Sequence, residues 1–343
     1  MNRRERRRQG KAGAAAPTAA AAPLSVSSML MGLAGQGGAP LAMAAPTMLA
    51  ADPVQSLLAR ERQQRELVEE LARQQRALAA EPDSELLLRS VGRLQLRLER
   101  RADALITYRR LLQLKPDHAE AAHLAAILAG ATPEKANADY VTKLFDAFAD
   151  NFDRTLTHWL DYRAPQHVAE TARAALAGRV AEHALDLGCG TGLLAPEMNG
   201  VVRRLDGIDL SPRMIEKAAE RKLYHQLEVA EIVAYLSGRP ARFDLLLAAD
   251  VLAYFGKLDE VFAAAKAALK PGSHFVATVE AHSGDGFSAG KSGRFAHGEG
   301  YLRQAAQTTG FAVVSLQPAA LRMEDGKPVP GLVFALGHHA GTE

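Results

Sequence analysis

Cysteine is almost absent from this sequence: Cys189 is the only one among 343 residues. A single cysteine excludes a disulfide framework within the chain and is compatible with a reducing compartment. It also argues against a structural zinc site, which usually needs several cysteines or a Cys/His cluster. We therefore expect no metal site, and we expect the protein to be cytoplasmic.

Long apolar runs and a strong net charge are also lacking. No uninterrupted apolar run reaches the length of a membrane span, because glycines and prolines break the nearest candidate, residues 25–50. We therefore expect no membrane partner. A formal net charge of +2 at pH 7 predicts no particular ligand.

The N-terminal part of the chain is poor in core-forming side chains. Residues 14–50 contain no charged side chain and consist mainly of Ala, Gly, Pro and Ser, so residues 1–50 are predicted to be a disordered tail. Arg and Lys crowd the first eleven residues. That cluster leaves open a targeting signal or a contact with an anionic partner. We interpret it as part of a solvated tail.

Residues 51–131 show the spacing of amphipathic helices, with leucines recurring among Arg, Gln and Glu. Pro82 and Pro116 lie 34 residues apart, which is the period of a tetratricopeptide repeat. The best match to such a repeat is residues 85–118. We therefore predict a small, all-α, tetratricopeptide-like region.

Within this repeat, Gly92 and Ala104 are small, and Tyr108 is the aromatic residue of the second helix. Small residues at these positions allow two antiparallel helices to approach closely. One good repeat cannot form a solenoid, so the helices must pack on their neighbours. The region is predicted to be either a docking site for a protein partner or a structural cap.

A larger domain is predicted over residues 132–343. Thr132-Pro133-Glu134 combines a capping hydroxyl, a proline in the first turn and an acid, which indicates a helix start and the beginning of a helical lid over residues 132–180. Strands then alternate with helical stretches, which predicts a mostly parallel sheet covered on both faces. The last two strands lack a helix between them and are expected to pair antiparallel at one edge. The expected strands are residues 183–187, 204–209, 227–230, 243–248, 274–279, 312–316 and 332–336.

Two motifs in this domain point to a nucleotide-like ligand. An apolar strand runs into the glycine turn Gly188-Cys189-Gly190-Thr191-Gly192, where the backbone can turn tightly and approach a ligand closely. A helix is expected to begin at Leu193. The next strand ends at Asp209, seventeen residues after Gly192, where a carboxylate can accept both hydroxyls of an adenosine ribose.

These motifs resemble those of the class I S-adenosylmethionine-dependent methyltransferases, and more narrowly those of the bacterial members with tetratricopeptide repeats. The resemblance covers residues 85–338. It implies a Rossmann-like, seven-stranded α/β sheet with its last strand antiparallel, and S-adenosylmethionine as the cofactor. The turn Leu269-Lys270-Pro271-Gly272 resembles the one before the family's fifth strand, and the segments 293–297 and 321–324 resemble this subgroup's C-terminal half.

The resemblance also implies roles for individual residues. Asp186 would order the glycine turn near the amino group of the methionine moiety, while Gly188, Gly190 and Gly192, with Cys189 between them, leave room for that moiety. Asp209 would bind the ribose. Phe152, in a segment similar to the family's N-terminal lid, would reach the cofactor. The residues implied at the adenine are Leu210, Met214, Glu231 and Ile232.

A dinucleotide-binding dehydrogenase is the main rival. It would require Gly-x-Gly-x-x-Gly, but Leu193 stands where the final glycine should be. A hydroxyl or ammonium acceptor needs a base near its proton. The candidates are Asp250 at the tip of the fourth strand and His297 in the glycine-rich segment 284–300, with His282 and Tyr301 as alternatives.

The sequence therefore predicts an enzyme that transfers a methyl group to an oxygen or nitrogen atom, with an unidentified small molecule as the acceptor. No Asn-Pro-Pro-Tyr/Phe stretch follows the fourth strand, so a nucleic-acid acceptor is not expected. Two alternatives remain open. One is a protein acceptor recruited by the helical repeat, and the other is a non-catalytic module that binds the cofactor or a partner.

Overall fold

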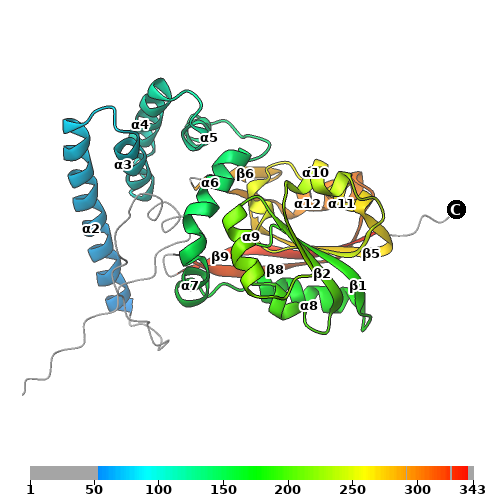
Figure 1. Cartoon of the computed structure of the whole chain (residues 1–343). Coiled ribbons are helices and arrows are strands. Elements are labelled where there is room, and N and C mark those ends of the chain that lie inside the picture. The colour runs from blue at the N-terminus through cyan, green and yellow to red at the C-terminus, as the bar shows by residue number, and fades with distance from the viewer. Residues whose placement is uncertain (1–52, 291, 325–326, 339–343) are drawn as a thin grey trace, which may run out of the picture.

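The computed structural model describes residues 53–290, 292–324 and 327–338. The predicted disordered tail, residues 1–50, lies outside the described residues. Figure 1 shows a group of helices at one end of the molecule and an α/β unit at the other, with α6 (Ala138–Phe148) between them.

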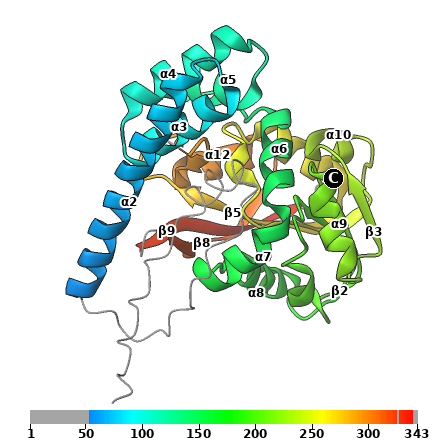
Figure 2. The same cartoon turned by 60° about the vertical axis from the view of Figure 1, so that its left-hand side comes forward.

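The helical group consists of four consecutive helices: α2 (Pro53–Ala80), α3 (Glu85–Arg97), α4 (Arg101–Leu114) and α5 (Ala119–Leu128). α3 and α4 approach closely at Gly92, where an added Cβ would lie 2.8 Å from Cζ of Tyr108. α2 packs on α3 through Leu71 and extends beyond it (Figure 2). The helices form where leucine periodicity predicts them, while the tetratricopeptide assignment stays a prediction.

The lid begins differently from the prediction. Thr132-Pro133-Glu134 is not helical, and α6 begins at Ala138, where the side chain of Asn137 accepts a hydrogen bond from the Tyr140 amide at 3.1 Å. The residues ahead of it are extended, because Lys135 forms a β-bridge with Phe255. After α6, the lid continues through the short helices η1 (Ala149–Asn151), α7 (Phe152–Arg154) and η2 (Thr155–Trp159) to α8 (Ala164–Leu176).

The sheet confirms the predicted fold class. Its main strand order is β3-β2-β1-β4-β5-β9-β8, in which the first five strands are parallel and β9 is antiparallel to both of its neighbours. Parallel strands are buried on both faces, which explains why the apolar runs marked them in the sequence. The strands are β1 (Ala181–Leu187), β2 (Val202–Asp209), β3 (Gln226–Val229), β4 (Phe243–Ala248), β5 (Leu269–Ala281), β8 (Ala312–Glu324) and β9 (Lys327–His338).

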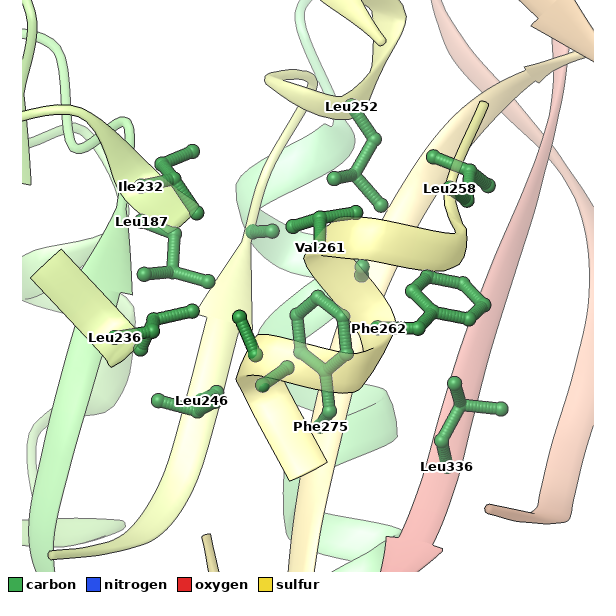
Figure 3. Close-up of a cluster of buried hydrophobic side chains, with 14 of the residues drawn as sticks. Leu187, Ile232, Leu236, Leu246, Leu252, Leu258, Val261, Phe262, Phe275 and Leu336 are labelled. Atoms are coloured by element: carbon green, nitrogen blue, oxygen red, sulfur yellow. The ribbon is translucent and has the colours of Figure 1, made fainter. Parts of the chain in front are cut away.

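Helices cover both faces of this sheet. One face packs against α10 (Ile232–Ser237), α11 (Asp259–Ala268) and α12 (Glu299–Thr308), where Val261 and Phe262 of α11 lie over Phe275 of β5 (Figure 3). The other face packs against α8 and the short helix η3 (Ala195–Met198). The remaining helices follow β2 and β4: α9 (Pro212–Glu220) and η4 (Leu252–Tyr254).

Three local predictions are wrong. The helix expected from Leu193 is only the single 3₁₀ turn η3, which carries Pro196 near its start. The turn expected at 269–272 belongs to β5, whose pairing with β4 shifts register there. The glycine-rich segment 284–300 contains two short strands, β6 (Phe287–Ala289) and β7 (Phe295–His297), and β7 pairs with the end of β5.

None of the helices in the described part of the chain combines the length and apolar character needed to cross a membrane.

Candidate active site

A cavity lies where β1, β2 and β4 end, and the lid residues Phe145 and Phe152 form part of its wall. Ligands of open α/β sheets bind at these carboxyl ends. The space inside is about 1000 Å³, including the part open to solvent. Its lining includes eight predicted site residues: Phe152, Gly188, Gly190, Asp209, Leu210, Glu231, Ile232 and Asp250.

The glycine turn is shaped so that side chains would not fit. Gly188 has φ +65°, and a Cβ there would lie 2.3 Å from Cγ2 of Val251. Gly190 has φ +55°, and its missing Cβ points toward the ring of Phe152 at 3.7 Å. Positive φ favours glycine at both positions, and the lack of space excludes a side chain at Gly188. The turn therefore leaves its backbone open to the cavity.

Asp209 at the end of β2 is held by the backbone on both of its oxygens. Oδ2 accepts from the Gly190 amide and Oδ1 from the Ser211 amide, both at 2.9 Å. Each carboxylate oxygen has a second lone pair, so two further donors can bind. Burial raises the pKa of Asp209 to about 6, against the lowering effect of the two amides.

An apolar slot lies beyond Asp209, lined by Leu210, Ala230 and Ile232. Glu231, also in the lining, caps α10 by accepting a hydrogen bond from the Ala234 amide to Oε2 at 2.9 Å. Glu231 lies at the edge of the slot, where its carboxylate could accept a hydrogen bond from a polar substituent of a flat ring bound in the slot.

Four predicted cofactor residues do not line the cavity: Asp186, Cys189, Gly192 and Met214. Asp186 is buried behind the turn, where it accepts from the Tyr224 hydroxyl at 2.7 Å, and burial raises its pKa to about 7. Cys189 and Met214 are buried, and the ring of Tyr224 packs over Gly192. These residues support the turn and α9 from behind.

At the other end of the cavity, Asp250 follows β4 with φ +63°, a conformation that costs free energy for a non-glycine residue. Its amide donates to Oγ1 of Thr278 at 2.9 Å. Its Oδ1 accepts from Nη2 of Arg294 at 2.5 Å, and Arg294 also lines the cavity. The β4 tip is therefore fixed to β5 and to the segment around β7.

A buried ion network continues behind this pair. Oε1 of Glu280 accepts from Nε of Arg294 and from Nη2 of Arg322, both at 2.6 Å, and Nε of Arg322 donates to Glu324 at 2.8 Å. Burial raises the pKa of Glu280, but the two guanidinium groups outweigh it and lower that pKa to about 2. Glu280 and the two arginines are therefore charged at neutral pH.

Two tyrosines and two phenylalanines complete this end of the cavity. The Tyr254 hydroxyl accepts a hydrogen bond from Nη1 of Arg294 at 3.2 Å. Burial, and to a smaller extent the negative charge of nearby Asp250, raise the pKa of Tyr162 well above its usual range. Phe145 packs edge-on against both Phe152 and Tyr254. An aromatic wall thus runs from the glycine turn to the ion network.

The structure does not bring His297 to the cavity, contrary to the prediction of an acceptor-side base. His297 is fully buried in β7, where Nε2 contacts the carbonyl oxygens of Phe255 at 2.9 Å and Gly256 at 3.0 Å. Burial lowers its pKa to about 4. Neither His282 nor Tyr301 lines the cavity, and the Tyr301 hydroxyl accepts from the Leu258 amide. Of the four candidates, Asp250 alone lies in the lining.

Three carboxylates tie the lid to the rest of the site. Asp146 accepts from Oγ of Ser211 at 2.5 Å, and Asp150 pairs with Arg213 at 2.6 Å. Asp153 accepts from the Thr191 hydroxyl in the glycine turn and also pairs with Arg221 after α9. We refer to these three residues, Asp146, Asp150 and Asp153, as the lid latch.

Comparison with known proteins agrees with this geometry. Residues 185–275 match a family model described as a methyltransferase domain. A ubiquinone biosynthesis O-methyltransferase of Thiobacillus denitrificans is 34% identical over 119 residues, covering 33% of this chain and 45% of that protein. Another, from Ralstonia nicotianae, is 28% identical over 183 residues, covering 48% of this chain and 74% of that protein. The chain thus spans less than half of the Thiobacillus protein's length.

Among solved structures, a 1,6-didemethyltoxoflavin-N1-methyltransferase of Burkholderia thailandensis with bound S-adenosylhomocysteine is 21% identical. It aligns with a TM-score of 0.48, covering 61% of this chain and 93% of that chain. The strand order and the glycine turn agree with the match of residues 185–275 to a methyltransferase domain.

Proposed function

We propose that this protein transfers the methyl group of S-adenosylmethionine to an oxygen or nitrogen atom of a small molecule. The observation that carries the proposal is one cavity with two chemically distinct ends. Asp209 and the open glycine turn lie at one end, and Asp250 with its ion network lies at the other. The relatives named as O-methyltransferases support an oxygen acceptor.

The residues at the first end fit this cofactor. The free lone pairs of Asp209 would accept the two ribose hydroxyls, and Leu210 and Ile232 would flank the adenine, with Glu231 at its edge. The backbone at Gly188 and Gly190 would face the methionine moiety. Phe152, which lies over Gly190, would cover that moiety from the lid.

When bound, S-adenosylmethionine supplies an electrophilic methyl group on a sulfonium. Held by Asp209 and the glycine turn, the cofactor would offer this methyl group to an acceptor placed beside Asp250. The acceptor's proton passes to Asp250 and then to solvent. The chain contributes mainly by holding the acceptor in line and excluding water, because methyl transfer depends on position and alignment.

Calorimetry and a transfer assay test this proposal. S-adenosylmethionine and S-adenosylhomocysteine should bind at micromolar concentration, while NAD should not bind. Labelled methyl should pass from the cofactor to a component of a cell extract, and size fractionation would show whether that component is small. Binding of NAD with no response to the sulfonium would overturn the proposal, and binding without any transfer would indicate a non-catalytic module.

A protein acceptor is the second candidate, and one feature favours it. A polar hollow lies between α3, α5 and the lid helix α6, lined by Arg89, Arg93, Glu120 and Lys143 among others. A partner seated there would touch the lid that covers the active site. In the fractionated extract, this candidate predicts that labelled methyl appears in the macromolecular fraction. Replacing Lys143 and Arg89 with Ala should then abolish that labelling.

A further inference from the structure

The far end of the cavity also limits which acceptors it can take. The ion network there contains three carboxylates, Asp250, Glu280 and Glu324, and two guanidinium groups, Arg294 and Arg322, a net charge of −1. Both arginine side chains are at most 5% exposed. Each guanidinium already pairs with at least two carboxylates, so neither is left to neutralise a further anion.

Asp250 retains hydrogen-bonding capacity in this network. Its Oδ1 is engaged by Arg294 at 2.5 Å, whereas the nearest partner of Oδ2 among the described residues is Nη1 of Arg322 at 3.4 Å. An ionised carboxylate is an acceptor only. It can therefore bind an O–H or N–H group in the cavity, and it would repel a carboxylate or phosphate.

The rest of this end is mainly apolar, with hydroxyl groups and the exposed Lys135 at its margin. Phe145 and Tyr254 form the aromatic wall, and Tyr162 adds a hydroxyl that makes no hydrogen bond to any described residue. Aromatic rings prefer edge-on or offset contacts with other rings. A ring in this space would keep its apolar surface on the wall and direct one polar substituent toward Asp250.

Resting on the proposed function, we infer that the acceptor is a flat, aromatic molecule, uncharged at its reacting end, that presents a hydroxyl or amino group to Asp250. A carboxylate or phosphate is disfavoured beside Asp250, because a second anion would be buried next to a network that already has excess negative charge.

Four probes with one shared ring test this inference: phenol, aniline, benzoate and phenyl phosphate. Their binding to the full chain saturated with S-adenosylhomocysteine is measured by ligand-observed NMR at pH 7.5. Phenol and aniline should bind at least about tenfold more tightly than the two anions. Asp250→Asn, which brings the network to zero net charge, should reduce that selectivity by about tenfold. Glu182→Gln, at a position 68% exposed near the start of β1, should leave it unchanged.

If Asp250→Asn does not fold, Tyr162→Phe removes a single hydroxyl at the same end. It should weaken phenol binding by a few-fold and leave the affinity for S-adenosylhomocysteine unchanged. Benzoate binding as tightly as phenol, or no probe binding to a protein that binds S-adenosylhomocysteine normally, would overturn the inference. Failure to bind S-adenosylhomocysteine would instead overturn the proposed function.

Discussion

Asp209 combines two properties that make cofactor binding depend on pH. Its carboxylate accepts two backbone amides, and burial raises its pKa to about 6. The ionised form is needed to accept the ribose hydroxyls, so the affinity for S-adenosylhomocysteine should fall as pH decreases through 6. Between pH 7.5 and 5 we expect a loss of about tenfold, the limit for one coupled proton.

Asp209→Asn should abolish most of that pH dependence and weaken binding at pH 7.5 by at least about tenfold, because charge-assisted hydrogen bonds contribute about 1.5–3 kcal/mol. Calorimetry at the two pH values measures both effects. The exposed Asp150→Asn serves as the control. A variant that binds within twofold of the wild type would remove Asp209 from the cofactor site.

His297 is expected to affect stability rather than turnover. Its pKa of about 4 in the folded protein lies below the value of about 6.5 in an unfolded chain. Between these values the unfolded state takes up a proton that the folded state does not, so the free energy of unfolding decreases as pH falls. From pH 7 to 5 this residue alone should account for a loss of about 2 kcal/mol.

Urea unfolding of wild type and His297→Gln at pH 7 and 5 measures that loss, which the variant should lack. His158→Gln, at an exposed position in the lid, should behave as the wild type. Methyl transfer by a folded His297→Gln should remain within a few-fold of normal. A drop of a hundredfold would return His297 to the list of catalytic candidates.

At the level of secondary-structure elements, the lid latch is expected to control release of the cofactor. Asp153 joins α7 both to Thr191 in the glycine turn and to Arg221, so the lid cannot lift without breaking these contacts. Asp153→Asn should raise the dissociation rate of S-adenosylhomocysteine several-fold. Trp159, the only tryptophan of the chain, lies in the lid helix η2 and reports the motion by stopped-flow fluorescence.

Asp150→Asn is the matched control for this experiment. Its pair with Arg213 is also in the latch, but the Asp150 side chain is 57% exposed, and surface pairs contribute about 0–1 kcal/mol. It should change the rate by much less. Equal dissociation rates in wild type and Asp153→Asn would show that the lid opens without this latch.

The elements also show which parts of the fold a single sequence predicts. The main strands were predictable because long apolar runs are typical of parallel strands buried on both faces. The strands β6 and β7 have three residues each and depend on pairing with β5, so no local pattern marks them. At Thr132-Pro133-Glu134 a good local helix signal gave way to a β-bridge between Lys135 and Phe255.

The candidate site likewise has one part that the sequence predicts and one part that only the folded structure reveals. The proposed cofactor end comes from two motifs that are close in sequence. The structure brings Gly190 and Asp209 into contact, while their role in cofactor binding stays a prediction. The acceptor end draws Tyr162, Glu280, Arg294 and Arg322 from segments far apart, and only the tertiary structure brings them together. The available signal was charge: Glu280 and Arg322 interrupt stretches of apolar residues, and in the fold Glu280 is partly buried and Arg322 is buried.

At the scale of the whole molecule, His123 connects the helical group to the acceptor end. It lies on α5, contacts the Gly293 carbonyl through Nε2 at 3.0 Å, and packs against Tyr140 of the lid and Phe295 of β7. It is only 6% exposed. His123→Ala should therefore lower the free energy of unfolding by about 2–4 kcal/mol, as for other large buried side chains.

Hydrogen exchange locates the effect of that substitution. Residues 293–297 should exchange faster in His123→Ala, while β1 and β2 should keep their protection. Ile106→Ala, at a position 67% exposed on α4, should change neither, because surface substitutions are usually within about 0.5 kcal/mol. Unchanged exchange at 293–297 would show that the helical group and the acceptor end are independent.

The position of β9 between β5 and β8 has a consequence for how the protein is made. Domains begin to fold from the N-terminal side during translation. Once residue 250 has left the ribosome, the strands that carry the glycine turn and Asp209 have emerged, whereas β5, β9, Arg294 and Arg322 have not. A nascent chain can therefore assemble the glycine turn and Asp209 first, and the ion network around Asp250 forms only after residues 312–338 emerge.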